Sequence, residues 1–144
     1  MEEENLKMGD HYSYSDCELE EQFRNCEFPA PLFSHEAHLR LAWIHLTKYG
    51  QERAVRNITR ELRSYVVFLG AEDKYNETLT VAAVKAVWHF MLRSEARNFK
   101  DFIAENPGLK YNFKDLIFQH YSTDIFNSPA AKKKFQEPEL LPFD

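Results

Sequence analysis

Two histidines three residues apart are the side chains of this sequence best suited to chemistry. His35 and His38 fall in the stretch LFSHEAHLRLAW, at the start of a segment whose apolar residues have helical spacing. Neutral imidazoles can share a metal ion, or one can act as a general base while the other polarises a substrate. The zinc-protease pattern H-E-x-x-H needs its histidines four residues apart, so this pair does not match it.

A helical projection gives each of these side chains a direction. At about 100° per residue, His35 falls near the centre of the apolar face and His38 at its edge. Glu36 falls about 100° from His35, so we expect it to take no part in a site. A histidine near the start of a helix is also commonly a structural residue bonded to a carbonyl or a tyrosine, and this interpretation stays open.

A second polar segment, YNETLT at 75–80, is the predicted partner of the histidines. Glu77 falls in the first turn of a helix, where the helix dipole favours a carboxylate. If the two helices are neighbours, Glu77 can approach both imidazoles and form a metal or acid–base cluster with them. The candidate metal ligands are His35, His38 and Glu77. The candidate ligand-binding residues are His35, His38, Tyr75, Asn76, Glu77 and Tyr121, and no catalytic residue is assigned.

The spacing of apolar residues and the cap residues predict the helices that position these side chains. Ser34 begins a helix that stops at Gly50, and a further helix occupies 51–69. Asn76 begins a helix that is apolar nearly all round, which is typical of a buried helix. Shorter helices are expected from Ser15, over 98–105, over 112–120 and from Ser128.

These elements predict an all-α fold. No stretch has the sustained period-two alternation of a strand. We expect a single-domain antiparallel bundle of about five to seven helices, with the helices that begin at Ser34 and Asn76 buried at its centre. Residues 1–14 are expected to form an acidic arm, and residues 15–144 a single helical domain.

Charge and composition limit the classes of partner that this chain is expected to bind. The formal net charge of the 144 residues is −5, without the broad basic surface that nucleic acid or an anionic membrane needs, so we expect neither partner. No apolar stretch approaches the ~20 residues that span a bilayer, and a cytoplasmic location is expected. Cys17 and Cys26 lack the C-x-x-C spacing of a zinc site, so we expect reduced thiols. The sequence leaves the oligomeric state open.

Three ordered motifs over about 33–142 resemble those of a known group of proteins. They read FSHEAHLRLAW, then KYNETLT, then YSTDIFNSPAAKKKFQEPELLP. The group consists of small bacterial all-helical proteins without an established activity, and its motifs are T-H-x-x-H-L-x-x-A-W, Y-H-E-T-I-T and Y-S…S-x-x-A-R…P-D-L-x-P. By position, the resemblance covers His35, His38, Trp43, Tyr75, Glu77, Thr78, Thr80, Tyr121 and Ser122.

This sequence departs from the group at Asn76, which stands where the middle motif has a histidine. Asparagine is a poor transition-metal ligand but a good helix cap, so the exchange weakens the case for a divalent metal, which is kept as a candidate cofactor. Two functional hypotheses follow. One is a small-molecule site between the two central helices, with an unidentified cofactor if any. The other is a non-enzymatic structural or interaction module in which the same residues form a buried hydrogen-bond network.

Overall fold

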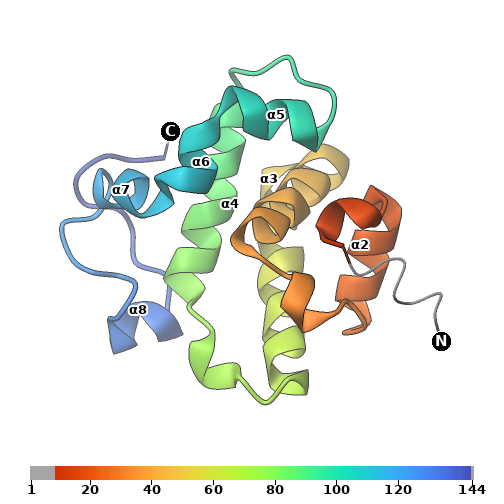
Figure 1. Ribbon diagram of the computed structural model, residues 1–144. Helices are drawn as coiled ribbons and strands as arrows, with labels where there is room; N and C mark the ends of the chain where they lie inside the picture. The colour runs from red at the N-terminus through yellow and green to blue at the C-terminus, as the bar shows by residue number, and fades with distance from the viewer. Residues whose placement is uncertain (1–8, 144) are drawn as a thin grey trace.

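The computed structural model describes residues 9–143, which fold into seven α-helices without a strand. The predicted all-α helical bundle is confirmed. Figure 1 shows α3 (His35–Phe68) and α4 (Glu77–Met91) at the centre, with α2 (Asp16–Arg24) on the right. The helices are α2 (Asp16–Arg24), α3 (His35–Phe68), α4 (Glu77–Met91), α5 (Phe99–Glu105), α6 (Pro107–Tyr111), α7 (Phe113–Phe118) and α8 (Pro129–Lys133). The described residues also form three short 3-10 helices: η1 (His11–Ser13) precedes α2, η2 (Ala30–Leu32) lies between α2 and α3, and η3 (Glu72–Lys74) lies between α3 and α4.

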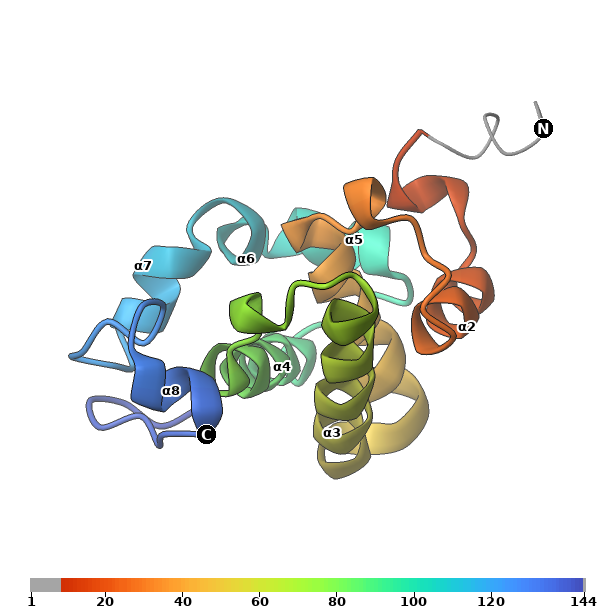
Figure 2. The same ribbon diagram turned by 90° about the horizontal axis from the view of Figure 1, so that it is seen from below.

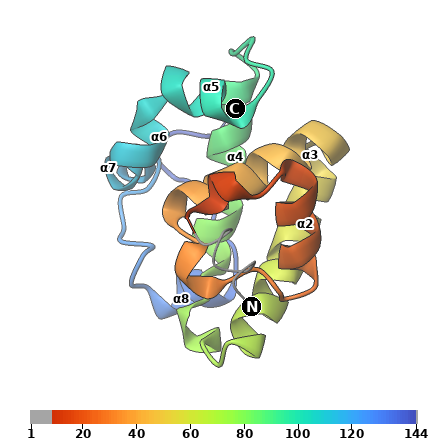
Figure 3. The same ribbon diagram turned by 45° about the vertical axis from the view of Figure 1, so that its right-hand side comes forward.

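The long helix α3 consists of two limbs that meet at Gly50. This residue has φ +82°, which glycine adopts without the steric cost of a Cβ atom. The predicted stop at Gly50 is therefore confirmed, although the second limb follows it directly, without a loop. Figure 3 shows the two limbs running in different directions from this elbow.

The second limb of α3 and α4 lie side by side, as Figures 1 and 2 both show. The cap residues begin these helices as predicted. The Ser34 hydroxyl accepts a hydrogen bond from the amide of Ala37 at 3.1 Å, and the Asn76 side chain accepts one from the amide of Leu79 at 2.9 Å. Each bond satisfies one of the amides that a helix start leaves without a partner.

Both central helices are largely buried. The first limb of α3 buries Leu39, Trp43 and Leu46, and the second buries Ile58, Leu62 and Tyr65. On α4 the buried residues fall on several faces of the helix, as expected from its nearly continuous apolar sequence. They are Thr78, Thr80, Val81, Ala82, Ala83, Val84, Ala86 and Val87.

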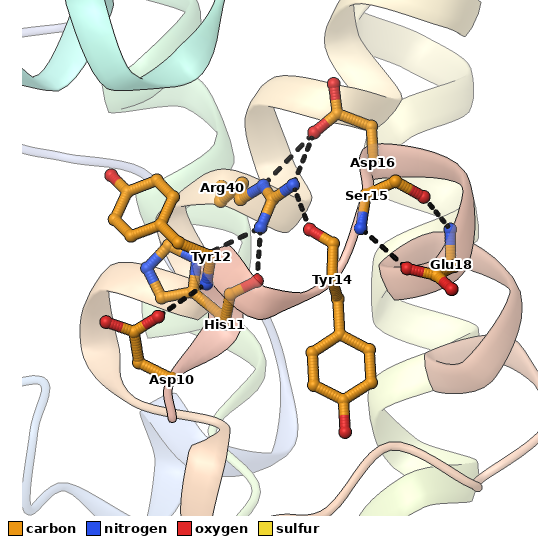
Figure 4. A network of polar contacts seen from close by, with 8 residues as sticks. All are labelled: Asp10, His11, Tyr12, Tyr14, Ser15, Asp16, Glu18 and Arg40. Atoms are coloured by element: carbon orange, nitrogen blue, oxygen red, sulfur yellow. Dashed lines mark hydrogen bonds and ion pairs between the residues drawn. The ribbon is translucent and has the colours of Figure 1, made fainter. Parts of the chain in front are cut away.

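The segment before α2 is packed on α3. Residues 1–8 of the expected acidic arm lie outside the described residues. Within residues 9–14, His11 is 2% exposed and Tyr14 is 6% exposed. Arg40 of α3 holds this segment: its guanidinium donates to the carbonyl oxygens of His11 at 2.6 Å and Tyr14 at 2.8 Å, and to the carboxylate of Asp16 at 2.9 Å (Figure 4). Residues 11–14 of the expected arm are therefore packed against α3.

Two further properties concern the described part of the chain. Among residues 9–143, none of the helices combines the length and apolarity that a membrane crossing requires. Cys17 is exposed and Cys26 half-buried, and both are free thiols.

Candidate functional site

His35 lies at the start of α3 and is exposed. Its Nε2 donates to the carbonyl oxygen of Leu109 on α6 at 2.9 Å, and its ring packs 4.8 Å from that of Phe113. The expectation that His35 is central to a buried face is wrong. A side chain in the first turn points back beyond the start of the helix, so the projection that describes the middle of a helix misplaces it.

His38 lies one turn further along the same helix. Its ring packs 5.5 Å from that of Phe33, and its Nε2 is buried without a hydrogen-bond partner. Burial, together with the nearby His35, lowers the pKa of His38 to about 4. At neutral pH His38 is therefore an uncharged imidazole in contact with an aromatic ring.

Glu77 makes its contacts with Arg63 and Tyr75. Its Oε1 accepts hydrogen bonds from the Tyr75 hydroxyl at 2.5 Å and from the Arg63 guanidinium at 2.8 Å. The pKa of Tyr75 is raised by burial and by the adjacent carboxylate. The structure thus brings Tyr75 and Glu77 together, and separately His35 and His38, but among residues 9–143 no contact joins the two pairs.

Asn76 and Tyr121 bind the backbone of the C-terminal part of the chain. The amide of Asn76 donates to the carbonyl oxygen of Ile125 at 2.8 Å. The Tyr121 hydroxyl donates to the carbonyl oxygen of Gln136 at 2.7 Å, and burial raises its pKa. The Thr78 hydroxyl donates to the carbonyl oxygen of Lys134 at 3.0 Å and accepts from the amide of Gln136. These polar groups are used to fix the path of residues 125–136.

The candidate metal ligands are not gathered. Within residues 9–143, no three side chains of the His, Cys, Asp or Glu types form a group that could hold a metal ion. This corrects the metal version of the predicted site at His35, His38 and Glu77. The physical reason is that Glu77 is engaged by its own neighbours on α3 and η3, rather than by the first turn of α3.

Glu36, which the projection set aside, is the most connected carboxylate near His35. It accepts a hydrogen bond from the Tyr12 hydroxyl at 2.9 Å, and its Oε1 lies 3.3 Å both from Nε2 of His11 and from Nζ of Lys110. Burial by itself would raise the pKa of Glu36, but these contacts hold it below its usual value. A helical projection of α3 does not include other elements, so it cannot show that η1 and α6 fold over the start of α3 and contact Glu36.

A second group of ionisable residues lies at the elbow of α3 and was not predicted. His45 is 1% exposed and Glu61 is 6% exposed, and Nε2 of His45 lies 3.8 Å from Oε1 of Glu61. Neither of these two atoms has a hydrogen-bond partner. Burial lowers the pKa of His45 to about 4 and raises that of Glu61. We name these two residues the elbow pair.

A cleft of about 280 Å³ lies between α4, α7 and the C-terminal segment 140–143. His120 holds this segment in place: its Nδ1 donates to the carbonyl oxygen of Leu141 at 2.7 Å, and its ring stacks on that of Phe143 at 4.1 Å. The lining residues are Ala86, His89, Phe90, Leu116, Gln119, His120, Leu141, Pro142 and Phe143. We name this hollow the C-terminal cleft.

No protein-family model, curated protein or solved structure matches the chain. The fold defines it as an all-α helical bundle. The resemblance of its motifs to the bacterial group stays a prediction, and so does the cytoplasmic location.

Proposed function

We propose that this protein binds a small, neutral and largely apolar molecule in the C-terminal cleft. The observation that supports the proposal is the cleft itself, which has six apolar and three polar lining residues and a volume of about 280 Å³. Ligand pockets are mostly apolar with a few polar groups, and their volumes begin near ~300 Å³. The proposal keeps the predicted small-molecule partner and assigns it to the C-terminal half of α4.

The lining of the C-terminal cleft favours an uncharged ligand with a flat ring. Among the described residues that line it, none is Asp, Glu, Lys or Arg. Because Nδ1 of His120 carries the proton donated to Leu141, Nε2 of a neutral His120 is a hydrogen-bond acceptor. We expect a ligand N–H or O–H to bond to this nitrogen while the ring packs against Phe90 and Phe143.

Indole is the probe that tests the proposal, because it is a flat apolar ring with one N–H group. Titration of the full chain, followed by amide chemical shifts, should move the signals of 86–90, 116–120 and 140–143 in a saturable way. The matched ligand 1-methylindole lacks the donor and should bind several-fold more weakly. Equal binding of the two ligands would overturn the role of His120.

Two variants test the location of the ligand. Leu116→Trp places a large ring on the α7 wall, and Gln119→Trp narrows the cleft from a residue that is already exposed. Both should abolish indole binding while Val67→Trp, at an exposed residue near the end of α3, should leave it unchanged. Undiminished binding by the two cleft variants, or shifts that do not saturate in wild type, would contradict the proposal.

For the residues of the predicted site, we propose the structural role that the sequence left open. The contacts of Asn76, Thr78 and Tyr121 with the backbone of 125–136 support it. Tyr121→Phe should then lower the stability of the chain and leave indole affinity within about twofold of wild type. A variant that loses affinity with unchanged stability would favour a direct site at Tyr121 instead.

A further inference from the structure

The elbow pair lies where the two limbs of α3 face each other, but no hydrogen bond links its two side chains. His45 belongs to the first limb and Glu61 to the second, with Gly50 between them in the chain. The 3.8 Å between Nε2 and Oε1 is longer than a hydrogen bond, and both atoms are shielded from solvent. A buried polar atom without a partner is rare in folded proteins because it loses its hydration without replacement.

The neighbouring Asn57 fixes which nitrogen of His45 carries the proton. Its amide nitrogen, which can only donate, lies 3.4 Å from Nδ1 of His45. A neutral His45 therefore carries its proton on Nε2, the atom that faces Glu61. The elbow pair is a matched donor and acceptor that are held slightly too far apart.

Charged groups from α2 and from both limbs of α3 face the elbow pair. From α2 come Glu20 and Arg24, from the first limb Lys48, and from the second limb Arg60. Glu20 is already engaged by Nζ of Lys48 at 2.6 Å and by the hydroxyl of Tyr49 at 2.5 Å. Arg60 remains the near cation of Glu61, with Nη2 at 3.6 Å from Oε2.

Arg60 and His45 face different oxygens of Glu61, Arg60 facing Oε2 and His45 facing Oε1. As a carboxylate, Glu61 is attracted to the Arg60 guanidinium at the surface. When Oε2 takes up a proton from solvent, this attraction is lost, and the buried charge disappears with it. Oε1 remains a hydrogen-bond acceptor and can then accept a hydrogen bond from the Nε2–H group of His45.

We propose that the elbow pair is a proton-dependent latch: protonation of Glu61 releases it from Arg60 and closes the hydrogen bond to His45, which draws the two limbs of α3 together across Gly50. The raised pKa of Glu61 supports the assignment of the added proton to this carboxyl group, and the lowered pKa of His45 keeps the imidazole neutral as the acid form of Glu61 appears.

The test is a pH titration of the full chain between pH 8 and 5, followed by amide chemical shifts of 44–62 and by the ring nitrogens of His45. We expect these amides to titrate together with one midpoint. We also expect the Nε2 signal of His45 to report a stronger hydrogen bond, without the change that marks an imidazolium ion.

Glu61→Gln is the decisive variant, because an amide imitates the protonated carboxyl group in size and keeps an acceptor oxygen. At pH 8 it should already show the low-pH shifts of wild type, and its titration at 44–62 should be lost. Glu52→Gln is the matched control: the side chain of Glu52 is 95% exposed on the same limb, and this variant should titrate like wild type. His45→Gln, which keeps a neutral donor, should retain the titration of Glu61 with a shifted midpoint.

Three outcomes would overturn the proposal. The first is a wild-type chain whose amide chemical shifts at 44–62 do not change between pH 8 and 5. The second is a Glu61→Gln variant that still titrates there as wild type does. The third is an imidazolium signal for His45 over the same range, since the proton would then reside on the wrong partner.

Discussion

Arg40, near the start of α3, and the elbow pair are buried ionisable groups with opposite hydrogen-bonding: Arg40 is fully bonded, and the elbow pair is not. Buried Arg40 has a partner for each of its three nitrogens, in the carbonyl oxygens of His11 and Tyr14 and the carboxylate of Asp16 (Figure 4). At the elbow, His45 and Glu61 are equally buried but leave two facing polar atoms without a bond. The first arrangement offsets the cost of desolvation, whereas the second does not.

This difference separates groups that hold the fold together from groups that are free to respond. A saturated network has no better arrangement available, so its loss only weakens the protein. An unsaturated pair has a better arrangement within a short movement, so a change of charge can shift it. The comparison therefore predicts a large penalty for substitution at Arg40 and little or none at Glu61.

The largest effect is expected for Arg40→Met, which removes every bond of the guanidinium to 11–16. The carbonyl oxygens of His11 and Tyr14 then lose their bonds from the guanidinium, and we expect a loss of about 3–5 kcal/mol in the free energy of unfolding, measured by urea denaturation. Arg56→Met, at an exposed residue of the same helix, should cost less than about 0.5 kcal/mol. Equal effects of the two variants would remove the contrast on which the comparison depends.

The next effect is the acid sensitivity that His45 confers. Its pKa is about 4 in the folded chain and about 6.5 when unfolded. Between these values the unfolded chain holds a proton that the folded chain lacks, so stability is full above pH 6.5 and falls as the pH drops toward 4. His45→Gln should reduce this slope by up to about 1.4 kcal/mol per pH unit. Urea titrations of wild type and variant at pH 7, 6, 5 and 4 measure this slope. If the variant has the same slope as wild type, folding does not lower the pKa of His45, and the prediction is wrong.

A smaller effect is expected for Tyr121→Phe. The variant keeps the buried ring but removes the donor to the carbonyl oxygen of Gln136, and we expect a loss of about 1–2 kcal/mol by urea denaturation. Tyr111→Phe is the control, because Tyr111 is 72% exposed and should be neutral to substitution. If Tyr121→Phe leaves the free energy of unfolding unchanged, this hydrogen bond adds no stability over a bond to water. That result would argue against the structural role proposed for the predicted site.

The same contrast explains how far the sequence alone could lead. The stop at Gly50 and the caps at Ser34 and Asn76 depend on local chemistry, so they were predictable. The elbow pair depends on the angle at which the second limb returns, because Glu61 meets His45 only through that bend. The contacts of Glu36 could not be predicted from its direction on the helix, because its partners come from η1 and α6, which are distant in the sequence. The sequence pattern therefore predicts the helices themselves, but not the contacts between them.

The smallest effect, and the one that most directly tests the comparison, is expected for Glu61→Gln. Burial raises the pKa of Glu61, so its stabilising form is the protonated one, and wild type loses stability as the pH rises through that pKa. At pH 8 the amide avoids a buried charge, and we expect a gain of between 0 and about 1 kcal/mol in the free energy of unfolding. Once the pH is below the pKa of Glu61 the advantage should vanish, because wild type then carries the proton that the variant imitates. Urea denaturation of both proteins at a series of pH values from 8 downward measures the difference. A loss of stability at pH 8 comparable with that of Arg40→Met would mean that the charged carboxylate holds the elbow together, and the two ends of the comparison would then be alike.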